Sequence, residues 1–516
     1  MSNQSDRQFT KDYVVKLLEG VRGKTLGDVD SSRQFDRTIN SEKITGIAGD
    51  VVEQSIFGYK RDSKQECDII IDGVSVELKT TGVRIPKKEQ EIVRNLKVTE
   101  YNKHLCAKEG ISVTAVTFEP KLDLEFMTSH FWQKAERMLI VLYEYNSYEV
   151  VPASMYKEFP IIDYCFNTFS DSERDQLRND WEIVRDYLVG IYNQYADRID
   201  RIDHLEGFTH ILRPNLLLIE LVPGFKKRVS GQNVSYQHPR YRLKQTFVDH
   251  IVHSHFARRA DEEVSLQKSF NSFAELDEQC HRLAELYGNH TFEMLKDELV
   301  ISCDIATTKD FGAKCILKRV GADCKSLNQI SYFTKAGIIA KTITLDAKGK
   351  GTEDMKLTSV DFDELTDRNV DFEESEMYSY FCEHSFLFPI FIEVDNTNPL
   401  KTYFAGFKRF AFDEDFLYNE VKRTWEDARH LIHSNKLEWV YDLDKNGNRI
   451  KNKSGSYKGA PNLPKSSDYA VFFRGGGNDS RDEFRTERVN NVSMMPQFLW
   501  LKRKYTANKL NTLKFL

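Results

Sequence analysis

An alternating stretch at residues 74–79 is the feature that most restricts how this chain can fold. Apolar and polar residues alternate strictly through it, as VSVELK, and a period of two is typical of a strand with one apolar face. Three isoleucines precede it, and Asp72-Gly73 separates the two runs. This dipeptide favours a two-residue hairpin turn, because glycine tolerates positive φ. We therefore expect a β-hairpin here.

The predicted hairpin brings charged side chains together. Glu77 and Lys79 share one face of the second strand, about 7 Å apart, and the turn folds Asp68 back toward Glu77. Two converging carboxylates form a hard oxygen site that suits Mg²⁺, and a neighbouring lysine can polarise a water or stabilise charge on a phosphate. The residues thus favour metal-assisted hydrolysis of a phosphodiester. The alternative is a surface salt bridge on an edge strand, and Asp72, which the turn aims at solvent, is a rival first ligand.

A further acid lies upstream of the hairpin. The spacing of apolar residues predicts a helix over residues 43–58, and Glu53 falls at the margin of its apolar stripe. A buried acid needs a partner, which the site at Asp68 and Glu77 with its cation would supply. The alternative is a glutamate that faces solvent.

Composition is that of an ordinary globular protein. The 516 residues suggest roughly two to four domains, and 40% of them are hydrophobic and 29% charged. No apolar run reaches about eighteen residues, which predicts no membrane span, and the polar N-terminus lacks the apolar core of a secretory signal. The eight cysteines are scattered without a CxxC pair. These features predict reduced thiols, no zinc knuckle and a cytoplasmic location.

Charge is unevenly distributed along the chain. The net charge is −6, yet residues 221–260 hold eight Lys or Arg against one acid, and residues 498–516 hold five against none. Residues 353–376 are strongly acidic instead. Local basic segments in an acidic chain suit grooves that hold a polyanion. Solvated helix faces are the alternative explanation.

Several blocks of the sequence resemble one family. "GDVVEQSIFG" and "CDIIIDGVSVELKTTGV" are similar to the catalytic core of the MutH-type endonucleases, which act in mismatch repair at GATC. They are also similar to the family's relatives among GATC-cutting type IIE restriction endonucleases, including the staphylococcal kind. "SHFWQKAERMLIVLYEY", "LRNDWEIVRDYLVG", "HILRPN" and "HPRYRLKQTFVDHIVHSHF" continue the resemblance in order. Ordered blocks over roughly 250 residues are far more specific than an ExK pair alone.

The resemblance implies both a fold and a catalytic set. The implied fold is α/β (α+β): a restriction-endonuclease-like PD-(D/E)XK core, in which helices flank a mixed sheet. The implied metal is Mg²⁺, held by Asp68, Glu77 and Glu53. The implied catalytic residues are Glu53, Asp68, Glu77, Lys79 and Lys134.

The resemblance also implies residues that contact DNA. Arg213 and Pro214 would read bases, and arginine forks readily onto guanine. Arg242 stands where the family has a tyrosine that senses adenine methylation, with Tyr241 just before it, so methylation sensitivity is left open. Phosphate contacts suit four further basic residues of this region, namely Lys226, Lys227, Arg228 and Lys244.

The second half of the chain contains faint copies of the same blocks. "HILRPN" is echoed by "VFFRGGG", which sets Arg474 against Arg213, and "YRLKQTF" is echoed by "LWLKRKY". The active-site positions are not kept, because Ile339 replaces the glutamate and Cys382 replaces Lys134. An apolar residue cannot bind Mg²⁺, so the copy is expected to bind DNA without cutting it.

These echoes predict tandem MutH-like domains. Residues 1–260 form the catalytic domain, residues 261–299 form a linker helix region, and residues 300–516 form an inactive, allosteric DNA-binding domain. The linker stripe includes Leu286 at its end. The DNA contacts expected in the second domain are Arg474, Lys502, Arg503 and Lys504.

Together these features predict a type II (IIE) restriction endonuclease that hydrolyses double-stranded DNA at GATC with Mg²⁺ and has a second effector site. Its partners would be DNA at two sites and a separate DNA methyltransferase. The chain would be a monomer that pairs on DNA, with no membrane contact. A MutH-like nicking or methylation-directed repair endonuclease is the alternative enzyme. A non-catalytic DNA-binding regulator is the alternative from another class.

Overall fold

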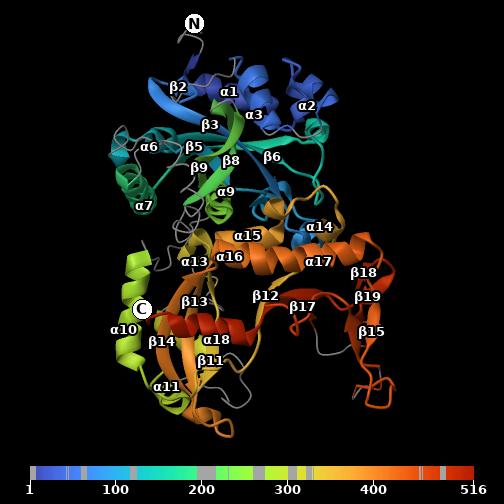
Figure 1. The fold of residues 1–516 in the computed structure, drawn as a ribbon. Helices are drawn as coiled ribbons and strands as arrows, with labels where there is room; N and C mark the ends of the chain where they lie inside the picture. Colours follow the sequence, from blue (N-terminus) through green and yellow to red (C-terminus); the bar gives the residue numbers. More distant parts are fainter. Residues whose placement is uncertain are drawn as a thin grey trace. The chain divides into compact units, whose positions relative to one another are not determined.

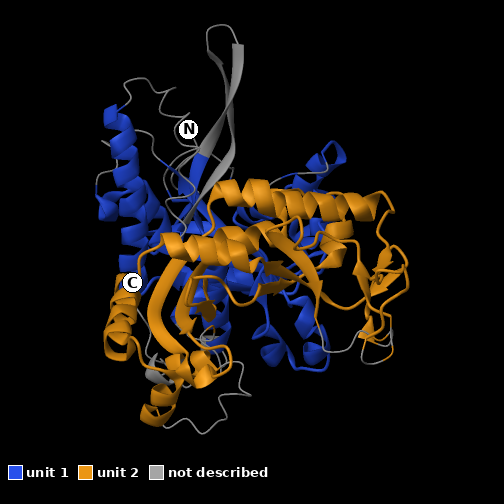
Figure 2. Ribbon diagram, turned by 60° about the horizontal axis from the view of Figure 1, so that its bottom comes forward, with its two compact units in different colours: residues 1–273, 331–337 blue, residues 274–330, 338–516 orange. Residues whose placement is uncertain are grey.

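The computed structural model describes most of the chain. The described residues are 7–41, 44, 46–59, 67–116, 125–194, 217–229, 232–259, 273–299, 311–320, 328, 331–452, 455, 457–476, 481 and 484–516. Side chains at 218–229, 232–238, 258–259, 317–320 and 331 are not described. The chain divides into two compact units, unit 1 with residues 1–273 and 331–337, and unit 2 with residues 274–330 and 338–516 (Figure 2).

A mixed sheet forms the centre of unit 1 (Figure 1). Its strand order is β1-β2-β3-β6-β7, and β4 pairs with the far end of β3. The β1–β2 and β3–β6 pairs are parallel and the others are antiparallel. The strands are β1 (Gln8–Phe9), β2 (Ile69–Ile71), β3 (Val74–Arg84), β4 (Cys106–Ala107), β6 (Arg137–Glu144) and β7 (Ile161–Thr168).

The predicted hairpin is confirmed. Ile71 of β2 faces Val74 of β3, so the loop contains only Asp72 and Gly73. Their φ angles are 48° and 79°, and two successive positive φ values define the tight turn that suits the twist of a hairpin.

Helices cover both faces of the sheet. Alternate residues of β6 enter two separate apolar clusters: Leu139 and Val141 pack with α1–α3, and Met138 and Ile140 pack with α6, α7 and α9. A strand buried on both faces explains the continuous apolar run of β6. These helices are α1 (Lys11–Val21), α2 (Leu26–Val29), α3 (Ile47–Val51), α6 (His130–Ala135), α7 (Asp171–Gln194) and α9 (Gln245–Arg259).

The helix predicted over residues 43–58 is shorter and less regular than expected. It consists of α3 followed by one π-helical segment, η3 (Val52–Ile56). Its apolar residues are buried as predicted, namely Ile47, Val51, Val52 and Ile56. Short helices complete unit 1: η2 (Gln34–Ile39), η4 (Lys87–Glu89), α4 (Gln90–Val93), α5 (Val98–Asn102), η6 (Phe126–Thr128), η7 (Ala153–Glu158) and α13 (Ser331–Ala336).

A second, antiparallel sheet of unit 1 leads into its last long helix. Its order is β5-β9-β8, and β9 ends one residue before α9 begins. The strands are β5 (Ile111–Ala115), β8 (Leu217–Val229) and β9 (Gln232–Leu243).

Unit 2 also contains a mixed sheet. Both β10 and β11 pair in parallel with β13, at successive stretches of it, and β14 pairs with β13 in the antiparallel sense. An antiparallel sheet of order β12-β20-β17 follows. The strands are β10 (Ile338–Ala340), β11 (Ile343–Asp346), β12 (Met355–Ser359), β13 (Ser385–Glu393), β14 (Tyr403–Ala411), β17 (Val471–Gly475) and β20 (Gln497–Leu501).

Two small hairpins and a set of helices complete unit 2. The hairpins are β15 (Trp439–Tyr441) with β16 (Gly459–Pro461), and β18 (Glu487–Val489) with β19 (Val492–Met494). The helices are α10 (Phe273–Tyr287), α11 (Phe292–Glu298), α12 (Phe311–Val320), α14 (Phe362–Thr366), η10 (Phe372–Glu374), α15 (Glu376–Glu383), η11 (Pro399–Lys401), α16 (Glu414–Phe416), η12 (Leu417–Val421), α17 (Lys422–His433) and α18 (Arg503–Thr512).

The predicted linker helix corresponds to α10, which from its second residue onward belongs to unit 2. Its Cys280 and Leu283 are buried, and its Asp277 pairs with Arg409 of β14 at 2.8 Å. Leu286, expected on the buried stripe, is instead 64% exposed. The helix therefore packs within unit 2.

The two units share an order of elements. In each, a 3₁₀ turn precedes a serine-capped helix, a central strand and an antiparallel strand. Ser129 accepts the N–H of Trp132 and donates to Phe126, and Ser375 makes the same two bonds with Tyr378 and Phe372. A long helix and two strands of a three-stranded antiparallel sheet follow, and a final helix comes directly after the middle strand. The third strand of each sheet, β5 or β12, lies earlier in the chain.

Among the described residues, no helix has the length and apolar character needed to cross a membrane.

Candidate active site

Glu77 is the centre of a compact charged cluster in unit 1. It is 1% exposed. The Nζ of Lys79 lies 2.8 Å from its Oε1, and the Nζ of Lys134 lies 3.0 Å from both of its carboxylate oxygens. Two ammonium groups therefore compensate one carboxylate that has lost its hydration, as a buried charge requires.

Strand register explains why these groups meet. Glu77 pairs with Met138 and Lys79 pairs with Ile140, and both partners belong to the apolar cluster on the α6 side of the sheet. Paired residues on neighbouring strands point to the same face. Lys134 sits in the last turn of α6, so it reaches Glu77 from the helix that covers that face.

Asp68 lies beside this cluster. Its Oδ2 accepts the backbone N–H of Leu78 at 3.0 Å, which places it next to β3. Burial raises the pKa of the Asp68 carboxyl and the charge of Glu77 raises it further, while Lys79 and Lys134 act in the opposite direction. A buried acid and a half-buried acid that repel each other form a place where a cation would be stabilised.

The rival first ligand is placed elsewhere. Both carboxylate oxygens of Asp72 lie 3.3 Å from the backbone N of Lys11, at the start of α1, and the side chain is exposed. Asp72 thus caps a helix and takes no part in the cluster.

Tyr59 is a site residue that the sequence did not reveal. It is 5% exposed, and its hydroxyl is buried without a hydrogen-bond partner in the structure as described. Burial raises the pKa of this hydroxyl far above its usual value, and the nearby charges of Asp68, Glu53 and Glu77 raise it further, opposed by Arg7. The Arg7 guanidinium lies 4.6 Å from the ring centre. No periodicity or motif marks this tyrosine.

Glu53 lies in η3 and is half-buried. Its backbone carbonyl accepts the N–H of Tyr59 at 3.2 Å. Within the described ranges, however, no three acidic, His or Cys side chains lie close enough together to hold a metal ion. The expected ligand set of Asp68, Glu77 and Glu53 is therefore not assembled here. Asp68 and Glu77 alone still fit Mg²⁺, which typically takes one or two protein carboxylates and completes its shell with water and phosphate oxygens.

The expected DNA contacts of unit 1 fall into two groups. Arg213 and Pro214 lie outside the described residues, and Lys226, Lys227 and Arg228 lie on β8 without described side chains. Tyr241 and Lys244 have relative exposures of only 3% and 0%, so they occupy the interior and not a surface that DNA can reach. This corrects the expectation of direct contact for these two residues. Arg242 is half-buried.

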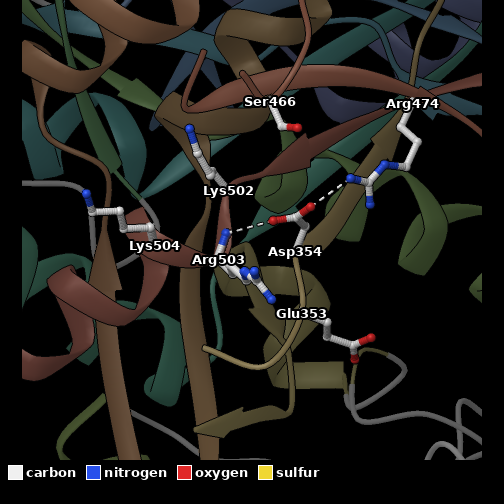
Figure 3. A pocket seen from close by; sticks show the side chains of 7 residues that line it. All are labelled: Glu353, Asp354, Ser466, Arg474, Lys502, Arg503 and Lys504. Carbon is white, nitrogen blue, oxygen red and sulfur yellow. Dashed lines mark hydrogen bonds and ion pairs between the residues drawn. The ribbon is translucent and has the colours of Figure 1, made fainter. Parts of the chain in front are cut away.

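The four basic residues expected to bind DNA in unit 2 gather around one cavity of about 560 Å³ (Figure 3). They are Arg474, Lys502, Arg503 and Lys504. Two acids, Glu353 and Asp354, line the same cavity.

One proposed sequence echo differs from the strand register. Leu243 and Leu501 occupy equivalent places, each ending a middle strand one residue before the last helix of its unit. Leu243 pairs with Leu217, and Leu501 pairs with Val471. Glu220 lies three residues after Leu217, and Arg474 lies three residues after Val471. By this register Arg474 corresponds to Glu220 and not to Arg213. The echo of "YRLKQTF" by "LWLKRKY" agrees with the register.

Comparisons with known proteins agree with this geometry. The family model for the DNA mismatch repair enzyme MutH matches residues 57–180, which include β2, β3, α6 and β6. The type II restriction enzyme Sau3AI of Staphylococcus aureus is 24% identical to this chain in an alignment covering 98% of the chain and 99% of that enzyme. The matched region contains the whole Glu77 cluster, so this part of the chain is similar to the MutH-type endonucleases.

Proposed function

We propose that this chain is a type II restriction endonuclease of the IIE kind, which hydrolyses double-stranded DNA at GATC with Mg²⁺. One observation carries the proposal: Glu77, Lys79, Lys134 and Asp68 converge in a chain that resembles a type II restriction enzyme over nearly its whole length. GATC follows from the family alone. The proposal includes a separate DNA methyltransferase as a partner. It also includes pairing of two monomers on DNA.

Each residue of the cluster has a distinct task in the proposed reaction. Asp68 and Glu77 would hold Mg²⁺, which when bound supplies a Lewis acid for the phosphate. Lys79, the more exposed of the two lysines at 21%, orients the attacking water. Lys134, with a side chain 10% exposed, holds the Glu77 carboxylate in position from α6. Glu53 would act through its charge, which reaches Tyr59 together with that of Asp68.

Cleavage of a plasmid with and without Mg²⁺ tests this proposal. Glu77→Ala is expected to lower the cutting rate at least about a hundredfold, because it removes the carboxylate on which both lysines converge, and to leave DNA binding in a gel-shift assay. The matched control is Glu91→Ala, an exposed glutamate of α4, which should cut normally. Normal cutting by Glu77→Ala would refute the assignment.

The same assay separates the alternatives. A nicking or repair endonuclease would accumulate open circles, while a restriction endonuclease would produce linear plasmid. A DNA-binding regulator would bind and never cut with any divalent cation. A buried carboxylate held by two lysines in the middle of a sheet has no evident use in a pure binder, which favours the enzyme.

We further propose that unit 2 is an inactive copy that binds a second duplex. The shared order of elements supports the duplication. Glu77 pairs with the second residue of β6, and Ile339 pairs with the second residue of β13. Lys134 and Cys382 each lie three residues before those strands begin. By register, unit 2 therefore carries an isoleucine and a cysteine where unit 1 has Glu77 and Lys134.

A further inference from the structure

Asp354 makes the closest contacts within the basic cavity of unit 2 (Figure 3). Its Oδ2 lies 2.7 Å from an Nη of Arg474, and its Oδ1 accepts the backbone N–H of Arg503 at 3.0 Å. Arg503 is the first residue of α18. The Asp354 carboxylate is therefore bound by a guanidinium and by the first backbone N–H of a helix. The same two kinds of donor bind phosphate groups in proteins.

Arg474 is held in place independently of this carboxylate. Its guanidinium carbon lies 5.0 Å from the ring centre of Phe472 and 4.7 Å from that of Trp500. Stacking on two aromatic rings fixes a guanidinium plane. The arginine would thus remain positioned if the carboxylate moved away, and its side chain is 44% exposed, against 17% for Asp354.

The charge around the cavity favours an anion larger than one carboxylate. Four cations line it, namely Arg474, Lys502, Arg503 and Lys504, against the two acids Glu353 and Asp354. The difference, four minus two, leaves a surplus of two positive charges. A carboxylate neutralises one charge, whereas a DNA backbone presents a row of them.

Unit 1 has no acid at the equivalent place. Met355 pairs with Leu501 and Ile111 pairs with Leu243, so Asp354 corresponds to Gly110. A Cβ at Gly110 would lie 2.2 Å from the backbone oxygen of Leu243, which leaves no room for a side chain. The acid is thus particular to unit 2.

We propose that Asp354 occupies the place of a DNA phosphate in unit 2, and that a backbone phosphate of the second duplex displaces it from Arg474 and from the start of α18. This inference rests on the proposed second DNA site. The Asp354 carboxylate then competes with DNA phosphates for Arg474 and for the backbone N–H of Arg503. This competition weakens the binding of single phosphates and sets the DNA concentration at which the second site fills.

The test measures the concentration of duplex oligonucleotide that half-maximally stimulates cutting of a one-site plasmid. Asp354→Asn keeps the shape and an acceptor for the Arg503 N–H but removes the competing charge. It is expected to lower that concentration roughly three- to tenfold, and more at low salt, because phosphate contacts are salt-dependent. Glu353→Gln is the matched control, because Glu353 lines the same cavity but does not pair with Arg474. This variant should shift the half-maximal oligonucleotide concentration less than Asp354→Asn does.

Three outcomes are decisive. If Arg474→Ala leaves stimulation unchanged, the proposed second site is wrong. If Arg474→Ala weakens stimulation but Asp354→Asn does not strengthen it, the second site stands and the role of Asp354 is refuted. Equal shifts for Asp354→Asn and Glu353→Gln would also refute it, because they would show a general charge effect. Should Asp354→Asn lower the thermal midpoint, Asp354→Ser provides the same comparison with a smaller acceptor.

Discussion

Glu77 shows how much a single buried charge depends on its neighbours. Its two lysines come from different elements, one from its own strand and one from α6. Breaking a buried ion pair from one side typically costs about 3–5 kcal/mol, because the remaining charge is left without compensation. Lys134 therefore contributes to the stability of unit 1 as well as to the proposed reaction, and the two contributions are measured by different experiments.

Tyr59→Phe is a prediction at the same scale. The buried hydroxyl has no partner in the described structure, and an unsatisfied buried polar group costs roughly 1–3 kcal/mol. Its removal should leave the thermal midpoint unchanged or higher. Cutting should slow about tenfold and need more Mg²⁺, because the hydroxyl lies near Asp68 and Glu53 and would orient water in the working site.

Tyr164→Phe is the matched control for this prediction. Its hydroxyl already donates to Glu19 at 2.9 Å, on the side of the sheet covered by α1. Its loss should lower stability and leave the Mg²⁺ dependence of cutting unaltered. A Tyr59→Phe protein with the normal rate and the normal Mg²⁺ requirement would show that Tyr59 is only a packing residue.

At the scale of elements, α13 is the clearest departure from chain order. It lies between two segments of unit 2 in the sequence, yet it belongs to unit 1. The Nζ of Lys335 lies 3.2 Å from Glu173 of α7, and the carbonyl of Lys335 accepts the hydroxyl of Thr246 at 3.3 Å. His250 of α9 lies 3.4 Å from the same Glu173 oxygen. One carboxylate thus joins three helices.

The pH dependence of stability tests this junction. Burial by itself raises the pKa of Glu173, but His250, Lys335 and Ser170 outweigh it and lower the pKa from 4.5 to about 2. A lowered folded-state pKa stabilises the protein above the unfolded value, and the stability is lost as pH falls from about 4.5 through about 2. The contribution is on the order of 3 kcal/mol.

Glu173→Gln should remove this component. Urea unfolding at a series of pH values should show a lower midpoint at neutral pH and a flatter decline below pH of about 4.5. The exposed Glu91→Gln serves as the control and should follow the unmodified protein. Parallel acid profiles for Glu173→Gln and the unmodified protein would exclude the carboxylate as the source.

At the scale of the whole molecule, the proposed second DNA site in unit 2 predicts dependence on the number of DNA sites. A plasmid with two GATC sites should be cut faster than one with a single site, and added duplex should raise the rate on the single site. Coupling between sites commonly amounts to roughly 5–150-fold. Arg488→Ala, in the exposed part of the β18–β19 hairpin, is a control for loss of a positive charge in unit 2. Equal rates on both plasmids, with no stimulation, would refute allosteric coupling.

The sequence by itself determined the features that depend on local periodicity. The turn at Asp72-Gly73 and the shared face of Glu77 and Lys79 follow from backbone geometry, which repeats every two residues in a strand. Lys134 was predicted as a site residue only from the resemblance of ordered blocks. It lies 57 positions from Glu77, and no periodic pattern connects residues so far apart.

Only the tertiary structure decided which side chains are buried and which distant groups meet. It placed Tyr59 among the acids, put Tyr241 and Lys244 in the core, and set Asp354 against Arg474, 120 positions apart in the chain. A basic residue in a sequence has the same formal charge whether it faces solvent or lies inside. Its environment depends on how the sheets and helices pack, and packing is a property of contacts between segments that a local pattern does not contain.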